Sequence, residues 1–113
     1  MPKRRGSRLE DLVASRYRKA GYDVRKHLIT DMGEIDVFSR RNRKRFAIEV
    51  KSGKQTLTST DVWKHIRKSR SLRAKPKFIV GPNVKFTSKA RSIAKELGVS
   101  IMRLKFSRRK GRK

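Results

Sequence analysis

The sequence contains no cysteine among its 113 residues. Disulfide bonds, cysteine-ligated zinc, iron–sulfur clusters and thiol nucleophiles are therefore excluded as sources of stability or chemistry. No apolar run approaches the roughly 18 residues that a membrane-spanning helix needs. The N-terminus also lacks the apolar segment of a signal peptide. These absences predict a cytoplasmic protein with no membrane partner.

Acidic residues are scarce. Nine Asp and Glu stand against 34 Lys and Arg, which gives a formal net charge of +25. Such a surplus repels itself and destabilises a compact chain unless a polyanion neutralises it. Binding to DNA or RNA would do so, because the contact with phosphates releases condensed counterions. The charge therefore predicts a nucleic acid as the partner.

The length is that of one domain. Residues 1–6 form a basic arm and residues 105–113 a basic tail, and neither shows apolar periodicity. Both are expected to contact phosphates rather than to contribute to the core. Residues 7–104 are predicted to form the folded domain.

Apolar spacing and turn residues predict an α/β fold in the order αβββαβαβ, a mixed central sheet flanked by helices. Gly21 is expected to end the first helix, and Thr87 to cap the third. The predicted elements are a helix over 9–20, strands over 22–28, 34–39 and 45–51, a helix over 60–72, a strand over 77–80, a helix over 88–97 and a strand over 99–104.

The few acids on apolar strands need an explanation. In the third predicted strand, apolar and polar residues alternate, so Glu49 and Lys51 share one face. In the second, Ile35 and Val37 are expected to face the core together, which turns Asp36 toward the opposite face. If these two strands pair, Asp36, Glu49 and Lys51 emerge side by side.

Two carboxylates and a lysine in this arrangement suit phosphodiester hydrolysis. Carboxylates supply the hard oxygen ligands that Mg²⁺ prefers. The ion polarises a phosphoryl oxygen and lowers the pKa of a bound water, which the lysine can orient. The alternative interpretation is a strand edge with solvated charges and no chemistry.

Asp36, followed thirteen residues later by Glu49-Val50-Lys51, resembles the bipartite signature of the PD-(D/E)xK nuclease superfamily, with Ile35 in place of the name-giving proline. The predicted element order is similar to the restriction-endonuclease-like fold of that superfamily.

The resemblance implies a Mg²⁺-dependent endodeoxyribonuclease, in which Mn²⁺ can substitute. Asp36, Glu49 and the backbone carbonyl of Val50 would bind the ion, and Lys51 would act on the attacking water. It further implies an acid from the first helix, which Glu10 matches as a catalytic and metal-binding residue.

Two branches of the superfamily are matched by different parts of the chain. Arg5-Gly6-Ser7 with Glu10 is similar to the archaeal Holliday junction resolvases, and residues 78–104 resemble the end of Mrr-type restriction endonuclease domains. The first branch implies a structure-specific enzyme acting on branched DNA, as a possible homodimer. The alternatives are an Mrr-like restriction or repair endonuclease acting on duplex or flap DNA, and a non-catalytic basic nucleic-acid-binding protein.

Several residues near these motifs have a structural interpretation as well. Glu10 could form a capping box with Ser7 instead of binding a metal. Trp63 is expected on the core face of the second helix, and His27 and His65 are expected to be ordinary surface or phosphate-contacting residues. Glu34 shares the predicted face of Asp36 but is expected to be solvated.

Basic residues of the arm, the turn near residue 42, the loop after the motif and the tail are expected to bind the DNA backbone. They are Lys3, Arg4, Arg5, Arg41, Arg43, Lys44, Lys54, Arg108 and Arg109.

Overall fold

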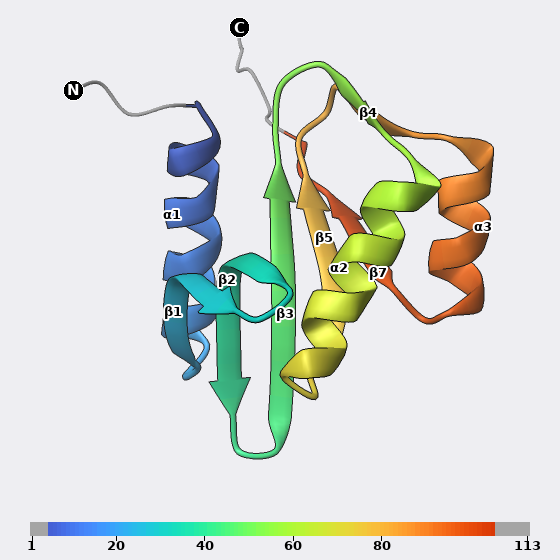
Figure 1. Ribbon diagram of the computed structural model, residues 1–113. Helices are drawn as coiled ribbons and strands as arrows, with labels where there is room; N and C mark the ends of the chain where they lie inside the picture. The colour runs from blue at the N-terminus through green and yellow to red at the C-terminus, as the bar shows by residue number, and fades with distance from the viewer. Residues whose placement is uncertain (1–4, 106–113) are drawn as a thin grey trace, which may run out of the picture.

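The computed structural model describes residues 5–105, with side chains from Arg8 onward. Its centre is a five-stranded sheet in the order β1-β2-β3-β5-β7, which is antiparallel from β1 to β3 and parallel from β3 to β7 (Figure 1). The predicted mixed sheet is therefore confirmed. The strands are β1 (Asp23–Thr30), β2 (Gly33–Arg41), β3 (Lys44–Lys51), β5 (Lys75–Val80) and β7 (Ser100–Arg103).

Helices cover both faces of the sheet. Helix α1 (Arg5–Lys19) lies on one face, and α2 (Ser59–Ser71) and α3 (Ser88–Glu96) lie on the other (Figure 1). Each face has its own apolar core: one joins α1 to β2, β3 and β5, and the other joins α2 and α3 to β5. None of the described helices is long and apolar enough to cross a membrane.

Two short strands were not predicted. β4 (Gln55–Leu57) and β6 (Val84–Phe86) pair in parallel as a separate two-stranded sheet. β4 leads directly into α2, whose N-cap is Thr58 in a capping box with Asp61. At the start of α3, the Thr87 side chain accepts a hydrogen bond from the Ala90 N–H, as predicted.

The first helix begins earlier than its apolar pattern indicates. Because α1 starts at Arg5, Ser7 has a helical backbone and is not the N-cap, so the alternative in which Glu10 forms a capping box with Ser7 is wrong. The helix ends before Gly21, which has a φ of 91°. The other predicted arm residues (1–4) and the tail residues 106–113 lie outside the described residues.

The predicted faces of the second and third strands hold in part. Val37 and Ile48 are paired in the β2–β3 register and share the core beneath α1. Ile35, however, packs with Ala47 and Ala74 in a different cluster, so its predicted common face with Val37 is wrong. The β1–β2 ladder is interrupted opposite the intervening Asp36, which breaks the simple alternation of side chains there.

The prediction that Trp63 belongs to the core is also wrong, because 38% of its surface is exposed. Helix α2 buries Val62, His65, Ile66 and Ser69, a stripe with the i, i+3, i+4, i+7 spacing of one helix face. His65, a residue expected at the surface, occupies the centre of that stripe and displaces Trp63 to its edge.

Candidate active site

Asp36 lies where β2 and β3 stop pairing. The ladder between these strands ends at the Val37↔Ile48 pair. Beyond it, the Val50 N–H donates to Oδ2 of Asp36 at 2.9 Å, so a side chain replaces the neighbouring backbone as acceptor. This bond fixes the half-buried carboxylate next to Glu49.

The pKa of Asp36 is raised from 3.8 to about 6. Burial is the main cause, since a charged carboxylate loses water there, and the charge of Glu49 adds to the effect. The Val50 N–H, Lys51 and Lys68 favour the ionised form but do not compensate. A cation bound at this carboxylate would reduce the electrostatic repulsion between Asp36 and Glu49.

Glu49 is held between two lysines. Its side chain is 13% exposed, with Oε2 3.6 Å from Nζ of Lys51 and Oε1 3.4 Å from Nζ of Lys68. Lys68, which extends from α2, also donates to the backbone carbonyl of Glu34 at 2.8 Å. It thereby links α2 to the start of β2. Nothing in the strand motif indicates Lys68, because its approach depends on how α2 packs across the sheet.

His65 lies beneath the same carboxylate, and its prediction as a surface residue is wrong. The ring is 1% exposed, and Nε2 lies 2.8 Å from the carbonyl of Ala47 and 3.1 Å from that of Lys77. Its Nδ1 lies 3.8 Å from Oε1 of Glu49. Burial lowers the pKa of His65 to about 4, so the ring is neutral at pH 7 and its Nε2–H donates to the carbonyls.

Glu10 reaches the site from α1. Its side chain is 13% exposed, and Oε1 lies 3.1 Å from Nε2 of His27. Burial, followed by the charge of Asp36, raises the pKa of Glu10. His27 was expected to be an isolated residue, but Nδ1 of its ring also lies 2.6 Å from Oε2 of Glu34. Glu34 therefore has a partner and is not merely solvated.

One ligand atom each from Glu10, His27 and Asp36 lie within 4.8 Å of one another. Glu49 and its partner Lys51 lie next to Asp36. The structure therefore brings the four predicted catalytic residues together: Glu10, Asp36, Glu49 and Lys51. Their roles stay predictions. Four of the nine acidic residues in this basic chain gather here: Glu10, Glu34, Asp36 and Glu49.

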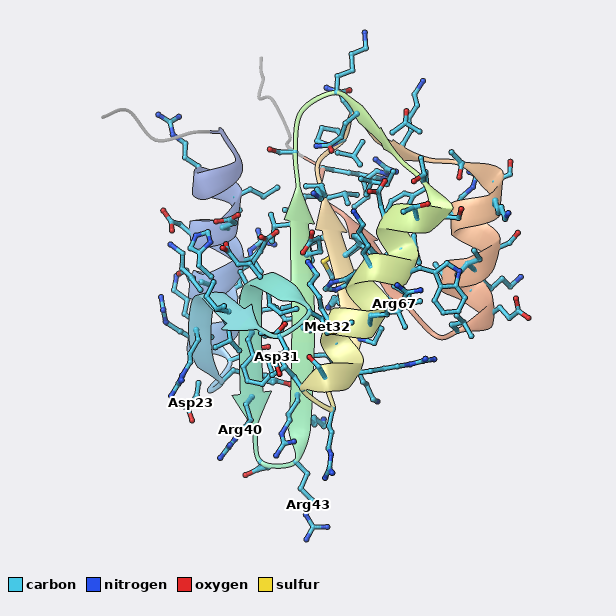
Figure 2. The ribbon with its side chains drawn as sticks, in the orientation of Figure 1. Asp23, Asp31, Met32, Arg40, Arg43 and Arg67 are labelled. Carbon is cyan, nitrogen blue, oxygen red and sulfur yellow. The ribbon has the colours of Figure 1, made fainter. Side chains whose placement is uncertain are left out.

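Three of the predicted DNA-contacting residues, Arg41, Arg43 and Lys44, lie at the β2–β3 hairpin. Arg43 extends from the tip of the β2–β3 hairpin (Figure 2), and Lys44 beside it is exposed. The guanidinium of Arg41 donates to the carbonyl of Ala20 at 2.8 Å and lies 5.9 Å from the ring centroid of Tyr22.

The other end of the β1–β2 unit approaches α2. Figure 2 shows Asp31 and Met32 at the β1–β2 turn. A Cβ added to Gly33 would lie 3.1 Å from Cδ of Lys68, which places this turn against the helix. Met32 in the turn is 53% exposed and Ile29 near the end of β1 is 73% exposed, so both apolar side chains lie at the surface.

The mixed sheet with helices on both faces is the restriction-endonuclease-like fold of the PD-(D/E)xK superfamily, and in it the Asp36 carboxylate lies beside Glu49-Val50-Lys51. Residues 3–105 match the Mrr catalytic-domain profile, described as restriction endonuclease. The chain therefore belongs to this family of endonucleases. Among curated proteins, none shows a significant sequence match.

Solved structures agree on the fold. A repair endonuclease from Pyrococcus abyssi is similar with a TM-score of 0.70 and 14% identity, covering 93% of this chain and 49% of that one. EndoMS in complex with double-stranded DNA gives a TM-score of 0.68 and 16% identity, covering 96% and 48%. The Holliday junction resolvase Hjc of Archaeoglobus fulgidus gives a TM-score of 0.55 and 23% identity, covering 75% of this chain and 67% of that one. The chain thus spans about half the length of the first two proteins.

Proposed function

We propose that this chain is a metal-dependent DNA endonuclease that hydrolyses phosphodiester bonds at Asp36, Glu49 and Lys51. The observation that carries the proposal is the position of Asp36, held by the Val50 N–H next to Glu49. Two partly buried carboxylates at one point disfavour each other and repel phosphate. A protein that only bound DNA would gain nothing from them, whereas a metal site requires them.

The residues present fit Mg²⁺, and Mn²⁺ can substitute. Asp36, Glu49 and Glu10 offer carboxylate oxygens, the ligand type that this ion prefers. The carbonyl of Val50 faces the same side as its N–H, since both groups of a strand residue point to one neighbour, and so it faces Asp36. When bound, the ion would polarise a phosphoryl oxygen and lower the pKa of a water molecule.

The two lysines at Glu49 have different roles. Lys51 is 33% exposed and can reach the substrate, where its ammonium would orient the attacking water by a hydrogen bond or offset the charge on the phosphorane. Lys68 is 13% exposed and bonded to the Glu34 carbonyl, so it positions the Glu49 carboxylate instead.

The surplus of positive charge supplies the affinity for DNA. Arg41, Arg43, Lys44 and Lys54 are exposed, and we infer that they contact phosphates. Lys44 lies five residues before Glu49 in β3, which corresponds to roughly 17 Å along a strand. Such contacts would follow the backbone away from the scissile phosphate, giving affinity without sequence preference.

We infer that the substrate is selected by its structure, with a four-way junction as the first candidate. The described residues form one domain around the site, with no separate module to read base edges. The fold similarity to a Holliday junction resolvase supports this choice. An enzyme that cuts two opposed strands needs two sites, so a homodimer is expected. Duplex or flap DNA is the alternative, supported by the match to the Mrr catalytic domain.

A cleavage panel tests the proposal. Labelled four-way junction, flap, duplex and single-stranded DNA are incubated with the protein in Mg²⁺, Mn²⁺ or EDTA. We expect cleavage in either ion, none in EDTA, and paired nicks in the junction. Binding of every DNA without cleavage in any ion would instead support the non-catalytic binding protein. Sedimentation velocity on the same preparation measures whether the protein is a dimer.

A further inference from the structure

His27 stands opposite Asp36 in the β1–β2 ladder. The register runs from Lys26↔Val37 to Leu28↔Ile35 without a slip, and the ladder is interrupted at the position between them. His27 has a φ of 55°, in the left-handed region that few residues other than glycine, asparagine, aspartate and histidine adopt. This local conformation brings the imidazole to the Asp36 carboxylate.

Both nitrogens of the ring meet a carboxylate. Nδ1 lies 2.6 Å from Oε2 of Glu34, and Nε2 lies 3.1 Å from Oε1 of Glu10. The side chain is 48% exposed, yet two partners from different elements fix its orientation. A surface histidine that only contacted phosphate would not need this arrangement.

We propose that His27 is a metal ligand, which together with Glu10 and Asp36 forms a mixed nitrogen–oxygen site for a divalent transition-metal ion. The donor atoms of the three residues already lie within 4.8 Å of one another. The inference rests on the proposed function, because Asp36 is shared with the expected metal position at Glu49.

Glu34 gives this ring the partner that metal-binding histidines usually have. A ligating imidazole commonly donates its second N–H to a carboxylate, which fixes the tautomer and the ring orientation. In the neutral ring, Nδ1–H would donate to Glu34, and the lone pair of Nε2 would face Glu10. Glu34 is therefore a positioning residue for His27.

The donor set also indicates which ion is bound. Carboxylates alone suit Mg²⁺, whereas imidazole is a better ligand for transition metals. One imidazole with two carboxylates should therefore favour Mn²⁺ over Mg²⁺. The competing interpretation is an ion pair only, in which a protonated His27 bridges Glu10 and Glu34 and binds no metal.

Pulsed electron paramagnetic resonance of Mn²⁺ distinguishes a His27 that binds the metal from a His27 that only forms an ion pair. Mn²⁺ is added below one equivalent to the full chain, and hyperfine coupling to imidazole nitrogen is measured. The chain has only two histidines, so labelling histidine with ¹⁵N must change the coupling if either one ligates. We expect the coupling in the unmodified protein and in His65→Gln, and its loss in His27→Gln. Glu34→Gln removes the carboxylate that positions His27, so it should weaken Mn²⁺ binding about 10-fold or more.

The outcomes separate this inference from the proposed function. Bound Mn²⁺ without nitrogen coupling would overturn the role of His27 and leave a metal at Asp36 and Glu49. No Mn²⁺ binding at all would overturn both metal assignments. Nitrogen coupling in a protein that cuts no DNA would support the His27 site and contradict the nuclease proposal. The labelled, unmodified protein gives an answer even where a variant folds poorly.

Discussion

The backbone N–H of Val50 donates a 2.9 Å hydrogen bond to Oδ2 of Asp36. The bond lies just past the last β2–β3 pair, so it holds the carboxylate at the point where the two strands separate. It favours the ionised acid, while burial and the neighbouring Glu49 oppose ionisation and raise the pKa of Asp36 to about 6. Burial and the charge of Glu49 destabilise the ionised Asp36, and for the same reason a bound cation would stabilise it.

The first prediction concerns pH and stability without metal. Folded Asp36 keeps its proton up to about pH 6, whereas the unfolded residue loses it near 3.8. The folded state thus binds more protons between these values, so this residue lowers stability as pH rises through that window. The full effect, reached above pH 6, is on the order of 3 kcal/mol. Asp36→Asn should therefore unfold at higher urea concentration than the unmodified protein in EDTA at pH 7.5.

Urea melts of both proteins at pH 5 and pH 7.5 measure this difference. The advantage of Asp36→Asn should be smaller at pH 5, where the native acid is mostly protonated. An asparagine variant that is less stable at both pH values would contradict the assigned cause of the pKa shift.

The second prediction concerns Lys68. Lys68→Met leaves Glu49 with one lysine and frees the Glu34 carbonyl, so the metal-free protein should lose about 2 kcal/mol of stability. Mg²⁺ should restore part of the loss, because the ion takes over the neutralisation of Glu49. Lys64→Met removes the same charge from an exposed position of α2 and is the matched control. Equal losses in the two variants, independent of Mg²⁺, would show that Lys68 does not position Glu49.

The third prediction concerns His65. Its ring packs 4.9 Å from that of Phe78 and bonds two strand carbonyls, so His65→Ala should cost roughly 3 kcal/mol. His65→Gln should retain more, because its amide can still donate. With the pKa of His65 lowered to about 4, stability should fall as pH drops from 6.5 toward 4. The difference between the pH profiles of the unmodified protein and His65→Gln isolates this effect, and two parallel profiles would contradict it.

Part of this site could be predicted from the sequence. Period-two alternation predicted Asp36, Glu49 and Lys51 side by side, and the resemblance added Glu10. The helices followed from apolar spacing and from the cap residue Thr87. These signals are local, so they can be recognised without knowledge of the tertiary packing.

The contributions of His27, His65 and Lys68 could not be predicted, because each depends on long-range placement. His27 acts through a left-handed backbone conformation, and Lys68 through the crossing of α2 over the sheet. β4 and β6 were missed for the same reason, since three residues are too few for a periodic pattern and their partners lie almost thirty residues apart.

The fourth prediction concerns DNA affinity. Each phosphate neutralised should contribute about −0.9 to the slope of log K against log salt, so six contacts give a slope of about −5. Deleting residues 105–113 should reduce the slope and weaken all DNA substrates alike. Fluorescence anisotropy over a salt series measures both. A deletion that alters substrate choice but not affinity would contradict a role in phosphate binding.

The central claim is tested most directly by Asp36→Asn in parallel cleavage and binding assays on a fluorescent four-way junction and a duplex. Asparagine keeps the shape and the acceptor for the Val50 N–H but removes the charge that would hold a divalent ion. We predict that cleavage in Mg²⁺ falls by several orders of magnitude while DNA binding is retained or strengthened. Glu49→Gln and Lys51→Ala should behave alike, with slightly weaker binding for the second. Cleavage by Asp36→Asn at the unmodified rate would contradict the account.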